Sequence, residues 1–326
     1  MALLNTQQAL DYAYAFYIPE FIFGGGYEVM EAERQKGEEA LKALVAAWNE
    51  GQDTSFGFDV VRELGDRNRA LCDAIGESRL RNTASSVLAR SLSDRDICQG
   101  IATMQGRTLA SVEREVRGDR NALGVAYVRE KVSGTVLGID IETTGTAPER
   151  GYIINVGWEL MDLTSTAVPR DGEAHFFGLP ENPYKETGVP LENIHHINWS
   201  DIEGKPLFRE DRELQARLLD LMTSHPIMAH NAAFEDSWFM MHLEGYAEAR
   251  REGKIVVIDS RDICRRLDGE VASLPRESAP AALENWARRR GTLAENEAER
   301  HQGLEDTDLM LRTVQAEFNR KSMFAA

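Results

Sequence analysis

The chain has 326 residues, of which 42% are hydrophobic and 28% are charged, and its formal net charge is −17 at pH 7. Such a length predicts two domains, or one domain with a large extension. The acidic balance argues against a protein that holds long duplex DNA by neutralising its phosphates. The three cysteines lie far apart and form no CxxC pair, which argues against a disulfide framework or a zinc site.

The first 133 residues predict a helical N-terminal domain of unknown role. Residues 38–51 carry apolar side chains at helical spacing, and Ser93 and Asp96 resemble a capping box. The apolar stretch at residues 9–26 contains two acidic residues and lacks a basic start or a cleavage site of small residues. We therefore expect a packed helix in a cytoplasmic protein without a membrane partner.

Residues 134–326 predict an α/β domain. Three closely joined strand-like runs indicate an antiparallel meander, after which helix and strand patterns alternate. This order predicts a mixed sheet with helices packed on it. The three runs are residues 135–142, 152–162 and 173–180, and they are followed by a helix near 210–224, a strand at 226–231, a helix from about 234, a strand at 254–260 and two or more helices.

Asp140 and Glu142 lie at the end of the first apolar run. Residues two apart on a strand point to the same face, so both carboxylates can reach one spot. Two like charges this close repel each other unless a cation lies between them, and oxygen ligands of this kind favour Mg²⁺ or Mn²⁺. Taken alone, the pair is also compatible with an exposed strand edge.

Two later segments add further polar groups. His230 and Asn231 form a turn ahead of Glu235 and Asp236, which open the helix predicted from about 234. His301 and Asp306 are five residues apart, and one helix through both would place them about 140° apart, on different faces. We therefore expect His301 in a loop just before the helix that carries Asp306. The buried stripe of that helix is predicted to be Leu304, Leu311, Val314 and Phe318.

Taken in order, these segments resemble the three motifs of the DEDD-type 3′-to-5′ exonucleases. The resemblance is to the DnaQ-like, His-containing DEDDh subgroup, which includes the epsilon-type proofreading exonuclease domain of DNA polymerase III. Its motifs correspond here to Asp140–Gly145, His230–Asp236 and His301–Asp306. Residues 194–208 also resemble the connecting segment of the family, and the resemblance covers about residues 134–320. Each motif alone is a weak signal, whereas three in order with suitable spacing are a strong one.

The second motif departs from the family pattern. An Asp directly follows the Phe in the bacterial proofreading exonucleases, whereas Glu235 occupies that place here and Asp236 comes one residue later. We predict Asp236 as the functional residue, because the segment after it restores an Asp-x-x-aromatic-apolar helix. Glu235 stays open as the rival.

The resemblance implies a ribonuclease H-like fold with a mixed five-stranded sheet and flanking helices. It also implies two Mg²⁺ or Mn²⁺ ions, roughly 3.5–4 Å apart, that stabilise the attacking and leaving oxygens of a phosphodiester. The implied metal ligands are Asp140, Glu142, Asp236 and Asp306. His301 would take a proton from the attacking water, since an imidazole has an ordinary pKa of about 6.5.

The remaining implied roles concern the substrate. Thr143 and Thr144 would line the pocket for the terminal nucleotide, and Asn231 would complete the substrate-binding set by fixing the turn before the second motif. The expected activity is removal of nucleoside 5′-monophosphates from the 3′ end of single-stranded DNA or short RNA, in replication, repair or RNA turnover. The expected partners are such 3′ ends or short oligonucleotides, and a polymerase or another delivering protein.

Two other functions remain open at this point. One is a catalytically inert module that keeps the exonuclease fold and binds nucleic acid or a polymerase. The retained set of mutually repelling carboxylates counts against it. The other is a two-metal phosphatase acting on small nucleotides, which would release inorganic phosphate and would not shorten oligomers stepwise. The acidic excess, −13 in residues 134–326 against −4 in residues 1–133, fits short or delivered substrates better than long ones.

Overall fold

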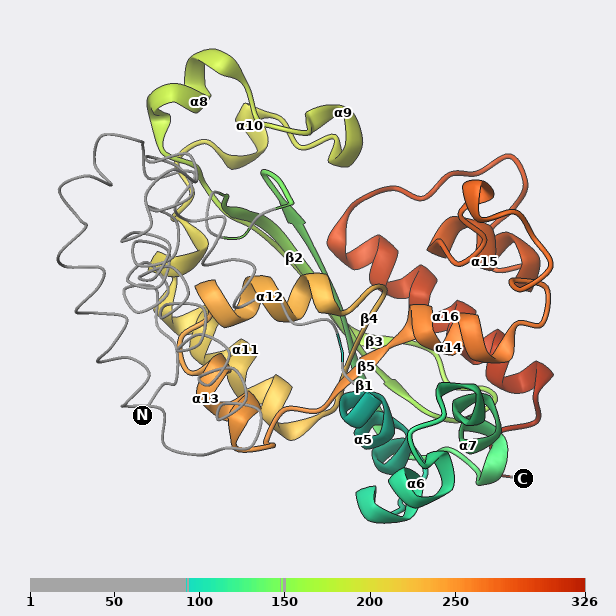
Figure 1. Cartoon of the computed structure of the whole chain (residues 1–326). Helices are drawn as coiled ribbons and strands as arrows, with labels where there is room; N and C mark the ends of the chain where they lie inside the picture. Colours follow the sequence, from blue (N-terminus) through green and yellow to red (C-terminus); the bar gives the residue numbers. More distant parts are fainter. Residues whose placement is uncertain (1–91, 93, 147, 149–150, 326) are drawn as a thin grey trace, which may run out of the picture. The chain divides into compact units, whose positions relative to one another are not determined.

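A computed structural model of the chain describes residues 92, 94–146, 148 and 151–325 (Figure 1). The chain forms two compact units. The described part of the smaller unit is residues 145–146, 148, 151 and 237–254, and that of the larger unit is residues 92, 94–144, 152–236 and 255–325. The predictions for residues 9–26 and 38–51, and the cap at Ser93, lie outside the described residues.

The larger unit is built on one five-stranded sheet with strand order β3-β2-β1-β4-β5. β1 (Thr135–Thr143), β2 (Ile153–Asp162) and β3 (Arg170–Phe176) form the predicted antiparallel meander. β4 (Ile227–Ala229) and β5 (Val257–Asp259) run parallel to β1. This mixed sheet with flanking helices has the strand arrangement of a ribonuclease H-like fold, so the predicted fold class is confirmed.

The helices of the larger unit follow the sequence pattern closely. The predicted helix near 210–224 is α11 (Arg212–Ser224). After β5 come α14 (Ser260–Leu267), α15 (Leu283–Arg290) and α16 (Gly303–Arg320). Three short helices, α8 (Glu181–Thr187), α9 (Glu192–His195) and α10 (Trp199–Ile202), lie between β3 and α11. The second-motif helix, α12 (Ala233–His242), begins in the larger unit and ends in the smaller one.

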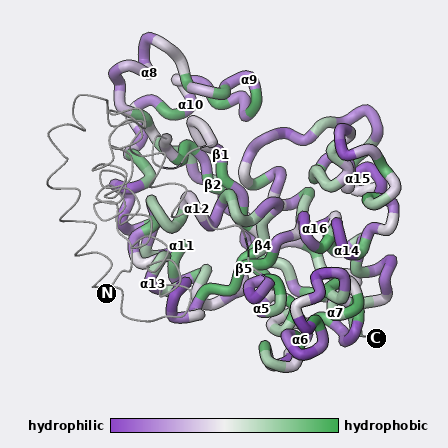
Figure 2. The backbone as a smooth tube through the Cα atoms, in the orientation of Figure 1, coloured by the Kyte–Doolittle hydropathy of each residue, from purple (hydrophilic) through white to green (hydrophobic). Residues whose placement is uncertain are grey.

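Three helices precede the sheet in the described chain. α5 (Asp94–Met104), α6 (Leu109–Val116) and α7 (Leu123–Arg129) bury side chains in the same hydrophobic core as β1, α14 and α16. Figure 2 shows the hydrophobic residues gathered along the central strands of this unit. The predicted domain boundary between residues 133 and 134 stays a prediction, because residues 1–91 lie outside the described chain.

The smaller unit is held by aromatic contacts in its described part. The Trp238 and His242 rings stack at 5.3 Å, and Phe239 lies 5.6 Å from the ring of Tyr246, the first residue of α13 (Tyr246–Arg251). His242 Nε2 donates a hydrogen bond to the Pro148 carbonyl oxygen at 2.7 Å. No helix of the described residues is both long enough and apolar enough to cross a membrane.

The first turn of α16 lies directly against the sheet. A Cβ atom built on Gly157 of β2 would overlap the backbone of Gly303 and Leu304, and one built on Gly303 would come within 2.9 Å of the Asp140 carbonyl oxygen. Asn155 holds this contact together, because its Oδ1 accepts a hydrogen bond from the Gly303 N–H at 2.9 Å. The missing side chains of two glycines thus allow a helix end to touch the strand that carries Asp140.

We expect Gly157→Ala to destabilise the larger unit by about 1–3 kcal/mol, the usual cost of overpacking a close contact. The added methyl group has to push the first turn of α16 off β2. The melting temperature should fall by roughly 2–4 °C for each kcal/mol lost. Gly269→Ala is the matched control, since a Cβ atom there meets no other atom within 4 Å. Equal melting temperatures for the two variants would contradict the expectation.

Candidate active site

The first two predicted carboxylates share a face of β1. Asp140 and Glu142 are both half-buried and alternate with the buried Ile141. Their partners on β2 are Gly157 and Asn155, the two residues that receive the first turn of α16. The carboxylates therefore lie at the point where α16 meets the sheet.

α16 and the loop before it add two more predicted residues. His301 lies in the loop with a left-handed backbone, φ +52°, and Asp306 lies in the first turn of the helix, as the angular argument predicted. One oxygen or nitrogen atom from each of Glu142, His301 and Asp306 lies within 4.8 Å of the other two. His301 Nδ1 is 4.0 Å from Asp306 Oδ2, and the Arg300 N–H donates to Asp306 Oδ1 at 3.3 Å.

Crowded negative charges raise the pKa values of these groups. Burial, followed by the charges of Glu235, Glu142, Asp306 and Glu299, raises the pKa of Asp140 well above its ordinary value. Burial and the charges of Asp306 and Glu299 raise the pKa of Glu142 to about 8. Burial and the charge of Glu299 raise the pKa of Asp306 to about 7, against a partial lowering by His301. Glu142 and Asp306 therefore titrate near neutral pH, and a bound cation would displace their protons.

α12 brings Glu235 to this cluster. Glu235 is the carboxylate whose charge acts most strongly on Asp140, and its own pKa is raised well above the ordinary value by burial, with Asp259 and Glu142 adding to the effect. The side chain is 3% exposed, and its Oε2 atom is buried without a hydrogen-bond partner in the described chain. Asp236 is fully buried, and its charge adds to the raised pKa of Glu235.

This set of groups fits divalent cations. Asp140, Glu142, Glu235 and Asp306 supply hard oxygen ligands from three separate elements, and burial makes their mutual repulsion expensive without a counter-charge. The orphaned Glu235 Oε2 is a buried acceptor that a bound ion would satisfy. Mg²⁺ and Mn²⁺ prefer such all-oxygen surroundings.

The predicted substrate-binding residues lie on two neighbouring turns. Thr143 is buried, while Thr144 is half-buried and joins Tyr152 twice, through its N–H at 3.0 Å and its Oγ1 at 2.9 Å. Asn231 is exposed with φ +69°, and its N–H donates to Asp259 Oδ1 at 3.0 Å. The Asn231 backbone is thus joined to the end of β5. The roles of all three toward a nucleotide stay predictions.

His230 has a structural role in this turn. Its Nε2 lies 2.9 Å from the Ala281 carbonyl oxygen, which can only accept, so Nε2 carries the proton and Nδ1 accepts from Ser260 Oγ at 2.9 Å. Burial lowers the pKa of His230 to about 4. The ring is therefore neutral at pH 7 and ties the second-motif turn to α14.

Several residues of the site were not predicted from the sequence. Glu299 is half-buried next to the carboxylates, has a pKa raised to about 7 by burial and by Glu284, and had no sequence signal. Asn155, Gly157 and Gly303 position α16, and here the glycines offered a signal: a glycine inside a strand often marks a close backbone approach. The sequence does not indicate which segment of the chain approaches these glycines.

One cation borders the site. Arg261, in the first turn of α14, donates from NH1 to Asn231 Oδ1 at 3.0 Å, and its Nε atom is buried without a hydrogen-bond partner in the described chain. The Asp259 carboxylate accepts from the backbone N–H groups of both Asn231 and Arg261. The second-motif turn, the end of β5 and the start of α14 are therefore joined around Asp259, beside Glu235.

No protein-family model matches the chain, and no curated protein matches its sequence. Among solved structures, the zinc-bound complex of E. coli ExoI with single-stranded DNA aligns with a TM-score of 0.44 and 16% identity, over 57% of this chain and 41% of the other. A full-length 3′-exonuclease aligns with a TM-score of 0.40 and 13% identity, over 73% of this chain and 80% of the other. The chain thus spans less than half of the ExoI structure. Both TM-scores lie below 0.5, so neither structure supports a conclusion about the chemistry of this site.

Without divalent cations, we expect the free energy of unfolding to fall as the pH rises from about 5 to 8. The folded pKa values of Asp306, about 7, and Glu142, about 8, exceed those of the unfolded chain. The folded protein therefore binds more protons in this window, and stability is lost as the pH rises through the folded pKa values. Thermal unfolding in EDTA across this range measures the slope.

The Asp140→Asn variant provides the matched test of that pH dependence. Replacing this buried ionisable group with a neutral one of the same shape should make the free energy of unfolding fall less steeply between pH 5 and pH 8 in EDTA. It should also remove the extra stability that Mg²⁺ gives the unaltered protein. Asp220→Asn, on the exposed face of α11, should change neither quantity. A metal-free protein that becomes more stable from pH 5 to 8 would disprove the expected repulsion.

Proposed function

We propose that the protein is a metal-dependent 3′-to-5′ exonuclease that acts on single-stranded DNA or short RNA. The observation that carries the proposal is the cluster of Glu142, His301 and Asp306, whose ligand atoms lie within 4.8 Å of one another. Asp140 shares the strand face of Glu142, and Glu235 of α12 is near enough for its charge to act on Asp140. A structural role gives no physical reason to bury repelling carboxylates together. The motif order, which resembles that of the DEDD-type exonucleases, supports the phosphodiester as the bond that is broken.

We assign the second-motif position to Glu235 rather than to Asp236, which was preferred from the sequence. Glu235 is the carboxylate whose charge acts most strongly on Asp140, and its Oε2 atom has no hydrogen-bond partner in the described chain. A shift of one residue along a helix rotates a side chain by about 100°, so both cannot face the same cluster. The proposed metal ligands are then Asp140, Glu142, Glu235 and Asp306.

When bound, Mg²⁺ or Mn²⁺ would lower the pKa of a water molecule and stabilise negative charge on the leaving oxygen. Asp140, Glu142, Glu235 and Asp306 would hold the cations, and the burial of Glu235 and Asp306 limits the access of bulk water. His301 has a side chain 42% exposed, next to the buried Asp306, so its imidazole can take a proton from the attacking water and pass it to solvent. Its left-handed backbone aims the ring from the loop toward the carboxylates.

The substrate would enter beside the turns that carry Thr144 and Asn231. Thr144 is fixed by two hydrogen bonds to the Tyr152 backbone, so it offers a rigid edge next to Glu142. Arg261 and Asn231 are linked to each other, and Arg261 offers a guanidinium close to the acidic cluster for a phosphate of the strand. Release of nucleoside 5′-monophosphates from the 3′ end is the expected outcome.

The test is a time course on 5′-labelled 20-mers of DNA and RNA with Mg²⁺ or Mn²⁺. A ladder that shortens from the 3′ end, and that is absent with Asp140→Asn, is expected. His301→Ala should lower kcat by about 10²–10⁴-fold, the usual range for loss of a general base. Calorimetric titration with Mn²⁺ gives a readout independent of turnover. An intact oligomer together with no Mn²⁺ binding would rule the proposal out, and oligomer binding without cleavage would favour the inert module.

A pair of isosteric variants distinguishes the two acidic residues of α12. Glu235→Gln should weaken Mn²⁺ binding by at least about tenfold, because even partners outside the ligand set cost 10–100-fold. Asp236→Asn should leave Mn²⁺ affinity within about threefold of the unaltered protein. Melting temperatures serve as the control, since both residues are buried. Loss of Mn²⁺ binding with Asp236→Asn at an unchanged melting temperature would return the role to Asp236.

A further inference from the structure

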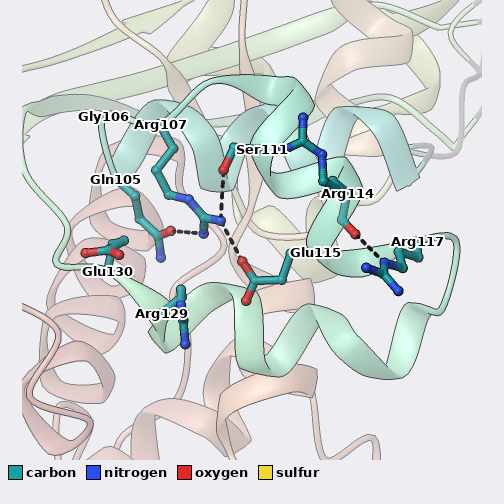
Figure 3. A pocket seen from close by; sticks show the side chains of 9 residues that line it. All are labelled: Gln105, Gly106, Arg107, Ser111, Arg114, Glu115, Arg117, Arg129 and Glu130. Atoms are coloured by element: carbon teal, nitrogen blue, oxygen red, sulfur yellow. Dashed lines mark hydrogen bonds and ion pairs between the residues drawn. The ribbon is translucent and has the colours of Figure 1, made fainter.

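A basic cavity lies between α6 and α7, on the helices that precede β1. It has a volume of about 900 Å³, and Arg107, Arg114, Arg117 and Arg129 line it (Figure 3). The surrounding segment, residues 107–131, carries six basic and four acidic side chains, in a chain whose net charge is −17. The cavity therefore concentrates positive charge on a strongly acidic protein.

The floor of the cavity is firmly built. Gln105 is 9% exposed, and its Nε2 donates to the carbonyl oxygens of Ala126 and Tyr127 at 2.9 and 2.6 Å. Its Oε1 accepts from Arg107 NH1 at 2.9 Å, and Arg107 NH2 pairs with Glu115 at 2.5 Å. These bonds join the end of α5 to α6 and to the end of α7. The helices that form the rim of the cavity are held in place by the hydrophobic core on which they pack.

The exposed positive charge of the cavity lies on its rim. Arg114, Arg117 and Arg129 are exposed, and none has a carboxylate partner among the described residues. The side-chain bond of Arg117 goes to a backbone acceptor, the Arg114 carbonyl oxygen, at 3.1 Å, and leaves its charge uncompensated (Figure 3). Glu130 also lies on the rim, so the three arginines exceed the acidic groups there.

Other arginines of the chain are used differently. Arg289 and Arg290 form ion pairs with the buried Asp268, and Arg290 also pairs with the buried Glu317. Arg288 pairs with Glu284 on the same helix. The run of basic residues on α15 is therefore structural. Arg114, Arg117 and Arg129 form no such ion pairs among the described residues, so their guanidinium groups are open to an outside anion.

From these observations we infer that the cavity is a second binding site, which holds backbone phosphates of the same single-stranded nucleic acid whose 3′ end the active site takes. The inference rests on the proposed function for the identity of the strand. Guanidinium groups recognise phosphate oxygens by paired hydrogen bonds as well as by charge. An open cavity with several arginines around its rim suits successive phosphates of a chain better than one small anion.

The distance between the two sites sets the length of strand that uses both. The cavity lies near the start of β1, because the Ser133 N–H donates to the carbonyl oxygen of Met104, next to Gln105, whereas the carboxylates lie toward the end of β1, near Glu142. At about 3.3 Å per strand residue, a path along β1 from Thr135 to Glu142 is roughly 23 Å long. A stacked strand at about 3.4 Å per nucleotide needs about seven nucleotides to span that distance. A trinucleotide can therefore fill the active site and cannot reach the cavity.

The first test measures binding without catalysis. Fluorescence anisotropy with a 20-mer is recorded in EDTA on the Asp140→Asn background, with and without Arg114→Gln, Arg117→Gln and Arg129→Gln together. Each lost phosphate contact should lower the slope of log K against log salt by about 0.7, so the triple variant should lose about two. The matched control neutralises three exposed cations elsewhere, through Arg95→Gln, Lys205→Gln and Arg276→Gln. Equal slopes for the two triple variants would overturn the inference.

The second test uses substrate length in the otherwise unaltered enzyme. The cavity variant should lower kcat/KM for the 20-mer at least about fivefold and leave kcat/KM for a trinucleotide within about twofold. Equal losses on both lengths would overturn the strand-binding role. Displacement of the 20-mer from the cavity by millimolar mononucleotide would overturn it as well, because it would indicate a site for free nucleotides.

The two tests separate this inference from the proposed function. A reduced salt slope without any hydrolysis would retain the cavity as a nucleic-acid site and reject the exonuclease. Hydrolysis of both lengths with an unchanged salt slope would retain the exonuclease and reject the cavity.

Discussion

The candidate active site depends on one contact, between the first turn of α16 and the central strands. Gly157 and Gly303 leave room for backbone to meet backbone, and Asn155 fixes the contact with a hydrogen bond to the Gly303 N–H. The loop that carries His301 and the helix turn that carries Asp306 are fixed by this contact. Because neither glycine has a side chain, the position of the helix at this contact is set mainly by backbone geometry.

This rigidity matters because the carboxylates around Asp140 oppose each other. Burial alone raises their pKa values, and each additional negative charge raises them further. A flexible scaffold would relieve such repulsion by letting the groups move apart or by admitting water. Here the sheet fixes two of the carboxylates and two helices fix the others, so the repulsion persists and only protons or cations can neutralise it. The groups of such a site are already in place for divalent ions before these bind. The cost is a lower free energy of unfolding for the metal-free protein.

The sequence predicted those parts of the site that depend on local periodicity. The two-residue period of a strand places Asp140 and Glu142 on one face, and the helical angle separates His301 from the helix of Asp306. The choice between Glu235 and Asp236 was beyond that reasoning, since helix starts are known only to within a few residues and each residue rotates the side chain by about 100°. Glu299 and Asn155 contribute through contacts between distant segments, and single-sequence patterns contain no record of such contacts.

The distribution of charge gives the two sites complementary properties. An acidic cluster attracts cations and repels a polyanion, so a strand approaching the active site without metal meets an unfavourable field. Positive groups placed next to the carboxylates would attract the strand, but they would also form ion pairs with the ligands and compete with the metal. Arginines on α6 and α7, near the opposite end of β1, would avoid that competition because screening at physiological salt limits charge effects to about 8 Å. Under the proposed function, this separation would allow one chain to hold both divalent cations and a polyanionic strand.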